Sequence, residues 1–107
     1  MTMNEYQQLA QRTINEELNV QEKMMHALHG MASEVGEIHG IYQKSYQGHE
    51  VAGIELQKEL GDLLWFIAEF CTAAEWSLEY IAHENIDKLR RRYPEGFDPE
   101  RSVHREG

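Results

Sequence analysis

The sequence predicts an all-α fold, a four-helix bundle in a single domain, and three observations lead to this class. Both prolines, Pro94 and Pro99, lie near the C-terminus, so the first 93 residues contain no proline that would break a helix. Apolar residues recur at helical spacing, and no stretch of any length alternates as a β-strand does. With 107 residues the chain has the length of one domain, predicted over residues 1–97 and followed by a polar tail over residues 98–107.

Two helices are expected in the first half of the chain. The first covers residues 4–17, where Tyr6 begins a weak apolar stripe. The second covers residues 20–46, where apolar side chains follow at steps of three and four, as on one buried helical face: Leu28, Met31, Val35, Ile38 and Tyr42. Gly48 then indicates a short turn.

Two more helices are expected after this turn. The third covers residues 54–74 and is rich in apolar side chains. The fourth begins after Ser77, whose hydroxyl suits an N-cap, and ends near Tyr93, just before Pro94. Because so short a chain buries only a limited fraction of its surface, we expect oligomerisation to complete the bundle.

Charge and composition exclude several classes of function. Ten Lys and Arg residues against nineteen Asp and Glu residues give a net charge of −9. A nucleic-acid-binding module needs excess positive charge, so we expect no nucleic-acid partner. No apolar run approaches the roughly 20 residues of a membrane span, and the N-terminus lacks the pattern of a secretory signal. The single cysteine, Cys71, fits a reducing compartment, so we expect a cytoplasmic protein without a membrane partner.

Two acidic pairs are the most informative feature of the chain. Glu34 and Glu37 lie on the second predicted helix, and Glu59 and Asp62 lie on the third. Residues three apart share one side of a helix. Glu37 and Glu59 are each eleven residues from Gly48, while Glu34 and Asp62 are each fourteen residues from it. In an antiparallel hairpin that turns at Gly48, the four carboxylates therefore meet in one patch.

Such a patch predicts a metal site. Four like charges at close range either raise their pKa values or bind cations. Oxygen ligands suit Mg²⁺, with Mn²⁺ as a substitute, and Mg²⁺ commonly links carboxylates to substrate phosphates. Two such ions can activate a water and stabilise the leaving oxygen of a phosphoryl displacement. Each acidic pair also encloses a glycine, Gly36 or Gly61, which costs about 0.5–1 kcal/mol in mid-helix and would be explained by close helix approach.

At these residues the sequence resembles the MazG-like nucleotide pyrophosphohydrolases, an all-α superfamily that acts on nucleoside triphosphates. The family motif of Glu-x-x-Glu, a spacer and Glu-x-x-Asp matches the two acidic pairs. An Asn-x-x-Lys element matches Asn85 and Lys88, and the basic, aromatic stretch that follows it matches residues 90–93. The resemblance covers roughly residues 25–97. It implies a MazG-like bundle that works as a homodimer or homotetramer, with helices of a partner helping to close each site.

The resemblance also implies an activity and a set of functional residues. The activity is Mg²⁺-dependent hydrolysis of a ribo- or deoxyribonucleoside triphosphate to the monophosphate and pyrophosphate. The acidic residues would ligate the metal, while Asn85 and Lys88 would contact the phosphates. Many members carry a glutamate where this chain has Ser33, and in some it orients the attacking water. Here either Glu34 or Glu37 takes that catalytic role, or a metal-bound water suffices.

Three other side chains are candidates for substrate binding. Phe66 lies four residues after Asp62, where it could support a nucleobase, although aromatic residues at helical spacing more often pack in a core. Arg92 could neutralise a triphosphate together with Lys88, or could simply favour the C-terminal end of the helix dipole. Lys44 lies on the side of Glu37 and is a minor phosphate candidate.

Other functions stay open at this point. A non-catalytic helical interaction protein would carry the acidic pairs as surface charges. A relative within the superfamily would cleave another pyrophosphate-containing substrate, such as phosphoribosyl-ATP, dUTP or dCTP. A zinc site is disfavoured because His26 and His29 have no third ligand at a suitable spacing. A di-iron carboxylate bundle would need Glu-x-x-His on two helices, a motif that the sequence lacks.

Overall fold

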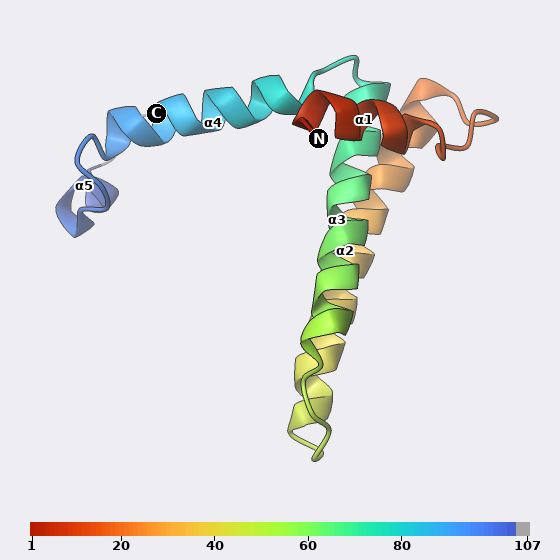
Figure 1. Cartoon of the computed structure of the whole chain (residues 1–107), viewed down its shortest axis with the longest axis horizontal. Helices are drawn as coiled ribbons and strands as arrows, with labels where there is room; N and C mark the ends of the chain where they lie inside the picture. Colours follow the sequence, from red (N-terminus) through yellow and green to blue (C-terminus); the bar gives the residue numbers. More distant parts are fainter. Residues whose placement is uncertain (105–107) are drawn as a thin grey trace.

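The protein, described here by a computed structural model over residues 1–104, is helical, and this part of the chain contains no β-strand. A long antiparallel hairpin of two helices forms its body, one helix lies across the open end of the hairpin, and another leads away from that end (Figure 1). The predicted all-α class is confirmed. In chain order the helices are α1 (Met3–Gln11), α2 (Val20–Ser45), α3 (Gly53–Ala73), α4 (Leu78–Arg92) and α5 (Pro99–Val103).

Helix α2 begins where its sequence provides a cap. The Asn19 side chain accepts a hydrogen bond from the Glu22 backbone N–H at 2.8 Å, and the Glu22 carboxylate accepts one from the Asn19 N–H at 2.9 Å. This reciprocal pair satisfies two donors that a helix start leaves free. Ser77 caps α4 as predicted, with its hydroxyl accepting from the Tyr80 N–H at 3.1 Å. The predicted limits of α2, α3 and α4 are therefore close to the observed ones.

The first helix is shorter than predicted, because α1 ends at Gln11 rather than near residue 17. Beyond it the Thr13 hydroxyl donates to the Ala10 carbonyl at 2.8 Å, and the Asn15 side chain accepts from the Glu17 N–H at 3.0 Å. Such bonds between short polar side chains and the backbone compete with helical hydrogen bonding. At the other end of the chain, the short helix α5 lies inside the predicted polar tail.

The core is small and lies where α1, α3 and α4 meet. Its buried members are Ala10, Ala68, Cys71 and Leu78, and Ile14 and Ala27 are buried outside this cluster. Burial raises the pKa of the Cys71 thiol, which makes this cysteine a poor nucleophile, as expected for a packing residue. Among the described residues, no helix has the length and the apolar character that a membrane span requires.

Helices α2 and α3 come into close contact at Gly30. A Cβ atom there would lie 2.2 to 2.6 Å from three ring atoms of Phe66, so the ring occupies the space that any larger residue would need. The glycines inside the acidic pairs behave differently, because a Cβ at Gly36 or Gly61 would meet no atom within 4 Å. Close helix approach, expected at those two positions, is therefore not found within one chain.

Helix α1 fixes the corner at which the chain leaves α3 and enters α4. The Gln7 side chain donates to the Trp76 carbonyl at 2.8 Å and accepts from the Leu78 N–H at 2.8 Å. Its amide also donates to the Thr72 hydroxyl at 3.2 Å, and Ser77 donates to the Asn4 side chain at 3.0 Å. These bonds tie both sides of the corner to one helix.

The chain as a whole is extended. Helix α4 leads away from the hairpin instead of packing along it (Figure 1), and the radius of gyration is 17.1 Å. A compact domain of about 100 residues has a radius of gyration of about 13 Å. Large apolar side chains are exposed on three helices, among them Leu28, Val35, Leu60, Ile81 and Ile86. The helices therefore do not close into a bundle within a single chain.

The contact at Gly30 predicts a difference between two glycine substitutions in α2. Gly30→Ala should lower the free energy of unfolding by about 1–3 kcal/mol, because the added methyl group meets the Phe66 ring and overpacks the interface. Gly40→Ala is the matched control, since nothing lies within 4 Å of its Cβ position. It should raise the free energy of unfolding by about 0.5–1 kcal/mol. Urea unfolding at one protein concentration, followed by circular dichroism, measures both, and equal effects would contradict the contact.

Candidate metal centre

Three carboxylates converge in the middle of the α2–α3 hairpin. Glu34 comes from α2, and Glu59 and Asp62 come from α3. One carboxylate oxygen from each lies within 4.8 Å of the corresponding oxygens of the other two. Glu34 is buried, Glu59 is half-buried and Asp62 is exposed, so the group spans the depth from the helix interface to the surface.

Glu37 also interacts electrostatically with these three carboxylates. Hydrogen bonding with Glu59 is the largest cause that raises the pKa of Glu37, and charge repulsion from Glu59 adds to it. The pKa of Glu59 is raised in turn, first by hydrogen bonding with Glu34. Asp62 raises the pKa of both Glu37 and Glu59 through its charge. Glu37 and Glu59 thus lie close enough to the other acidic residues for the shared negative charge to raise their pKa values, which agrees with the convergence that the count from Gly48 predicts.

Two oxygens of this cluster have no protein partner. Glu34 Oε2 and Glu59 Oε2 are buried, and neither has a hydrogen bond among the described residues. Buried polar atoms without a partner are rare, because removing them from water is costly. Carboxylate oxygens are the ligands that hard divalent cations prefer. The burial, the orphaned oxygens and the all-oxygen donor set therefore fit a divalent metal ion.

Helix α1 adds a residue that the sequence did not point to. Tyr6 is half-buried, and its pKa is raised first by this burial and then by the negative charge of Asp62. Its phenol therefore lies close enough to the acidic cluster to respond to its charge. The sequence showed Tyr6 only as part of a weak apolar stripe, which carries no information on the direction of its hydroxyl.

A second polar pair crosses the hairpin further along. Glu69 of α3 is buried, and both of its oxygens lie near Nδ1 of His26 on α2, at 2.8 and 3.0 Å. His26 therefore pairs with a carboxylate, and the metal-ligand group found among the described residues does not include it. The count from Gly48 contains a signal for this contact, since His26 is 22 residues before that turn and Glu69 is 21 residues after it.

The remaining candidates do not join the acidic cluster within one chain. Asn85, Lys88 and Arg92 lie in the second half of α4, which leads away from the hairpin (Figure 1). Lys44 lies in the last turn of α2, seven residues beyond Glu37. Phe66 packs on Gly30 and meets the rings of His26 and Trp65 edge-on, at centroid distances of 5.7 and 5.2 Å. The structure thus shows Phe66 as a packing residue of the hairpin.

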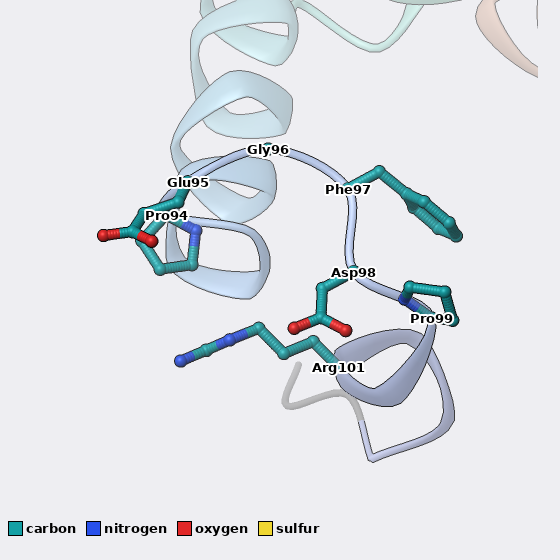
Figure 2. Close-up of a pocket in the computed structure, with 7 residues that line it drawn as sticks. All are labelled: Pro94, Glu95, Gly96, Phe97, Asp98, Pro99 and Arg101. Atoms are coloured by element: carbon teal, nitrogen blue, oxygen red, sulfur yellow. The ribbon is translucent and has the colours of Figure 1, made fainter.

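A surface pocket lies at the other end of the molecule. It has a volume of about 430 Å³ and follows the turn between α4 and α5 (Figure 2). Gly96 makes this turn with φ of +94°, a conformation that favours glycine. The residues that line the pocket are Pro94, Glu95, Gly96, Phe97, Asp98, Pro99 and Arg101. None of the four acidic residues lines it, so the pocket is separate from the candidate metal centre.

Comparison with known proteins identifies a family. The family model described as "MazG nucleotide pyrophosphohydrolase domain" matches residues 5–97 of this chain, which include every residue of the acidic cluster. No curated protein and no solved structure matches the chain.

The cluster predicts stabilisation by divalent cations. Mg²⁺ or Mn²⁺ should raise the melting temperature, because an ion that binds the folded state at a hundredfold excess over its Kd adds about 2.7 kcal/mol. Glu34→Gln and Asp62→Asn should remove most of this rise, since each takes a charged oxygen from the cluster. Glu55→Gln, an exposed position in the first turn of α3, is the matched control and should keep the rise.

Sodium chloride at equal ionic strength separates ion binding from general screening. An equal response to sodium and magnesium, or an unchanged response in Asp62→Asn, would contradict a metal site.

Proposed function

The chain belongs to the MazG nucleotide pyrophosphohydrolase family, and from this membership we propose that it is a Mg²⁺-dependent nucleoside triphosphate pyrophosphohydrolase. It would convert a ribo- or deoxyribonucleoside triphosphate to the monophosphate and pyrophosphate. The observation that carries this proposal is the cluster of Glu34, Glu59 and Asp62 with two orphaned buried oxygens. A polyphosphate is repelled by such a cluster unless cations stand between them, so the acidic site and the anionic substrate together require a metal.

The burial of each carboxylate suggests its role. Glu34 and Glu59, whose buried oxygens lack partners, are proposed as metal ligands together with Asp62. Bound Mg²⁺ would supply charge neutralisation for the phosphates and would lower the pKa of a bound water. Glu37 is exposed at the edge of the cluster, where it can reach a substrate and accept a proton from the attacking water. Of the two catalytic candidates, the structure therefore favours Glu37 as the base and Glu34 as a ligand.

The phosphate-binding residues are proposed to come from a second copy of the chain. Asn85, Lys88 and Arg92 lie on α4, which leads away from the acidic cluster of its own chain (Figure 1). The exposed apolar side chains of α2, α3 and α4 offer surface for a homodimer or homotetramer. In such an assembly, α4 of one protomer would bring cations to the acidic site of its partner. We also propose a cytoplasmic location, in keeping with the single buried thiol of Cys71.

The proposed activity is tested by pyrophosphate release from a panel of eight ribo- and deoxyribonucleoside triphosphates, with and without Mg²⁺. We expect release that depends on the metal, with a monophosphate as the second product. Glu37→Gln and Asp62→Asn should each reduce turnover by about 100-fold or more, while the helix content stays unchanged. Glu55→Gln should leave turnover unchanged. Full turnover in both cluster variants would remove these residues from the mechanism, and release only from another pyrophosphate substrate, such as phosphoribosyl-ATP, would move the chain to a related activity.

The second proposal is tested by mixing two inactive variants, Asp62→Asn and Lys88→Ala. If each site takes its carboxylates from one chain and α4 from another, a mixed dimer contains one intact site. Random mixing should then restore about one quarter of the wild-type turnover, because half of the dimers are mixed and each has one working site. If carboxylates and α4 served the same chain, every site would carry one defect and mixing would restore nothing.

A further inference from the structure

Glu69 is a carboxylic acid buried inside the α2–α3 hairpin. Its side chain has no exposed surface, and its two oxygens lie 2.8 and 3.0 Å from Nδ1 of His26. One proton between Nδ1 and the carboxyl group is enough for this hydrogen bond, whichever of the two groups carries it. Because burying a carboxyl group without a partner is costly, the burial of Glu69 depends on having His26 opposite it.

A second contact in the hairpin depends on the alignment of the same two helices. The Phe66 ring fills the space beside Gly30, so that a Cβ atom at this position would overlap the ring. The His26 ring meets the Phe66 ring edge-on at a centroid distance of 5.7 Å, which makes the two contacts neighbours. One turn away from Gly30 in either direction, at positions 26, 27, 33 and 34, every residue of α2 carries a Cβ atom.

The apolar part of the hairpin specifies this alignment only weakly. Apolar side chains of α2 recur at steps of three and four, so a slide of α2 along α3 by one turn, about 5.4 Å, brings apolar positions opposite one another again. The connection over residues 46–52 is almost entirely exposed. A change in its length costs little, because the entropy of loop closure varies slowly with loop length.

The two polar and glycine contacts do not tolerate such a slide. A slide by four residues places Glu22 or Gly30 opposite Glu69, and neither of them compensates for a buried carboxyl group. A slide by three residues places Lys23 or His29 there, but Phe66 then meets position 27 or 33, where a Cβ atom occupies the space of its ring. The observed alignment is therefore the one that satisfies both contacts.

The acidic cluster lies one turn from these contacts. Gly30 precedes Glu34 by four residues on α2, and Phe66 follows Asp62 by four residues on α3, a rise of about 6 Å in each helix. The oxygens of Glu34, Glu59 and Asp62 lie within 4.8 Å of one another, which is less than the shift of about 5.4 Å that one turn produces. A slide of one turn in either direction therefore removes at least one α2 carboxylate from the cluster.

We propose that His26 and Glu69 are positioning residues of the candidate metal centre, because their contact holds α2 and α3 in the alignment that brings Glu34 to Glu59 and Asp62. The inference rests on the proposed function, since it takes these carboxylates to be the ligands of a divalent ion. Buried polar groups fix the register of coiled coils in the same way, at a cost in stability. Neither His26 nor Glu69 touches the ion in this scheme, and both act through the alignment of the helices.

The test measures the Kd for Mn²⁺ from the electron paramagnetic resonance signal of the free ion, which requires no activity. The double variant His26→Leu with Glu69→Met replaces the pair by apolar groups, a change that buried ion pairs often tolerate. Its melting temperature without metal should equal or exceed that of the wild type. Its Kd for Mn²⁺ should rise about tenfold, because the correct alignment is then populated in about one molecule in ten. A pair with only a structural role would not lower metal affinity while stability is kept.

Three further variants complete the experiment. Glu69→Met alone leaves only the half-exposed His26 ring for water to solvate, and it should show the same rise in Kd. Glu69→Gln is the conservative variant and should keep the wild-type Kd, since an amide both donates and accepts and so pairs with Nδ1 in either tautomer of His26. The exposed His29→Leu substitution is the matched control and should also keep it.

An unchanged Kd in a folded apolar variant would overturn the inference, as would an equally large rise in Glu69→Gln. Unfolding of both apolar variants would also overturn it, because the pair would then be required for the fold and not for its alignment. The proposed function is judged separately. If wild-type protein binds Mn²⁺ but releases no pyrophosphate from any triphosphate, the proposed function fails and this inference is still decided by the Kd values. If wild-type protein does not bind Mn²⁺, both fail.

Discussion

The register between α2 and α3 decides which polar groups share the interior of the hairpin. The chain turns at Gly48, and side chains at similar distances before and after this turn meet across the interface. Glu34 meets Glu59 and Asp62 in this way, and His26 meets Glu69. A shift of one residue would turn each group by about 100° around its helix and separate both clusters.

The hairpin accepts polar groups at positions where apolar side chains would be more stabilising. Glu34 and Glu69 are both buried in the hairpin, while the main cluster of buried apolar residues lies at the corner where α1, α3 and α4 meet. The histidine compensates the burial of Glu69, but Glu34 Oε2 and Glu59 Oε2 have no such partner among the described residues. The two clusters thus differ, because Glu69 has its partner within the chain whereas the acidic cluster leaves two buried carboxylate oxygens without one among the described residues.

Much of the fold follows from the sequence, because local signals define its helices. Asn19 and Ser77 cap α2 and α4 where predicted, whereas the hydrogen bonds of Thr13 and Asn15 end the first helix sooner than its weak apolar stripe suggests. Counting from Gly48 also predicts that the acidic residues converge. The same count brings His26 nearly level with Glu69, but nothing else in the sequence marks the two residues as a pair.

The direction of α4 could not be predicted from the sequence. Helical periodicity indicates which face of a helix is apolar, but it does not give the direction of the helix relative to the others. That direction is set at the corner after α3, where Glu75 adopts a positive φ of 61° and Gln7 bonds to the backbone on both sides. Helix α4 is about 22 Å long. A tilt of about 10° at its first residue therefore moves its last turn by about 4 Å. The side chains of Gln7 and Asn4 on α1 thereby help to fix the position of the basic residues at the far end of α4, so a small change at the start of the chain produces a larger displacement there.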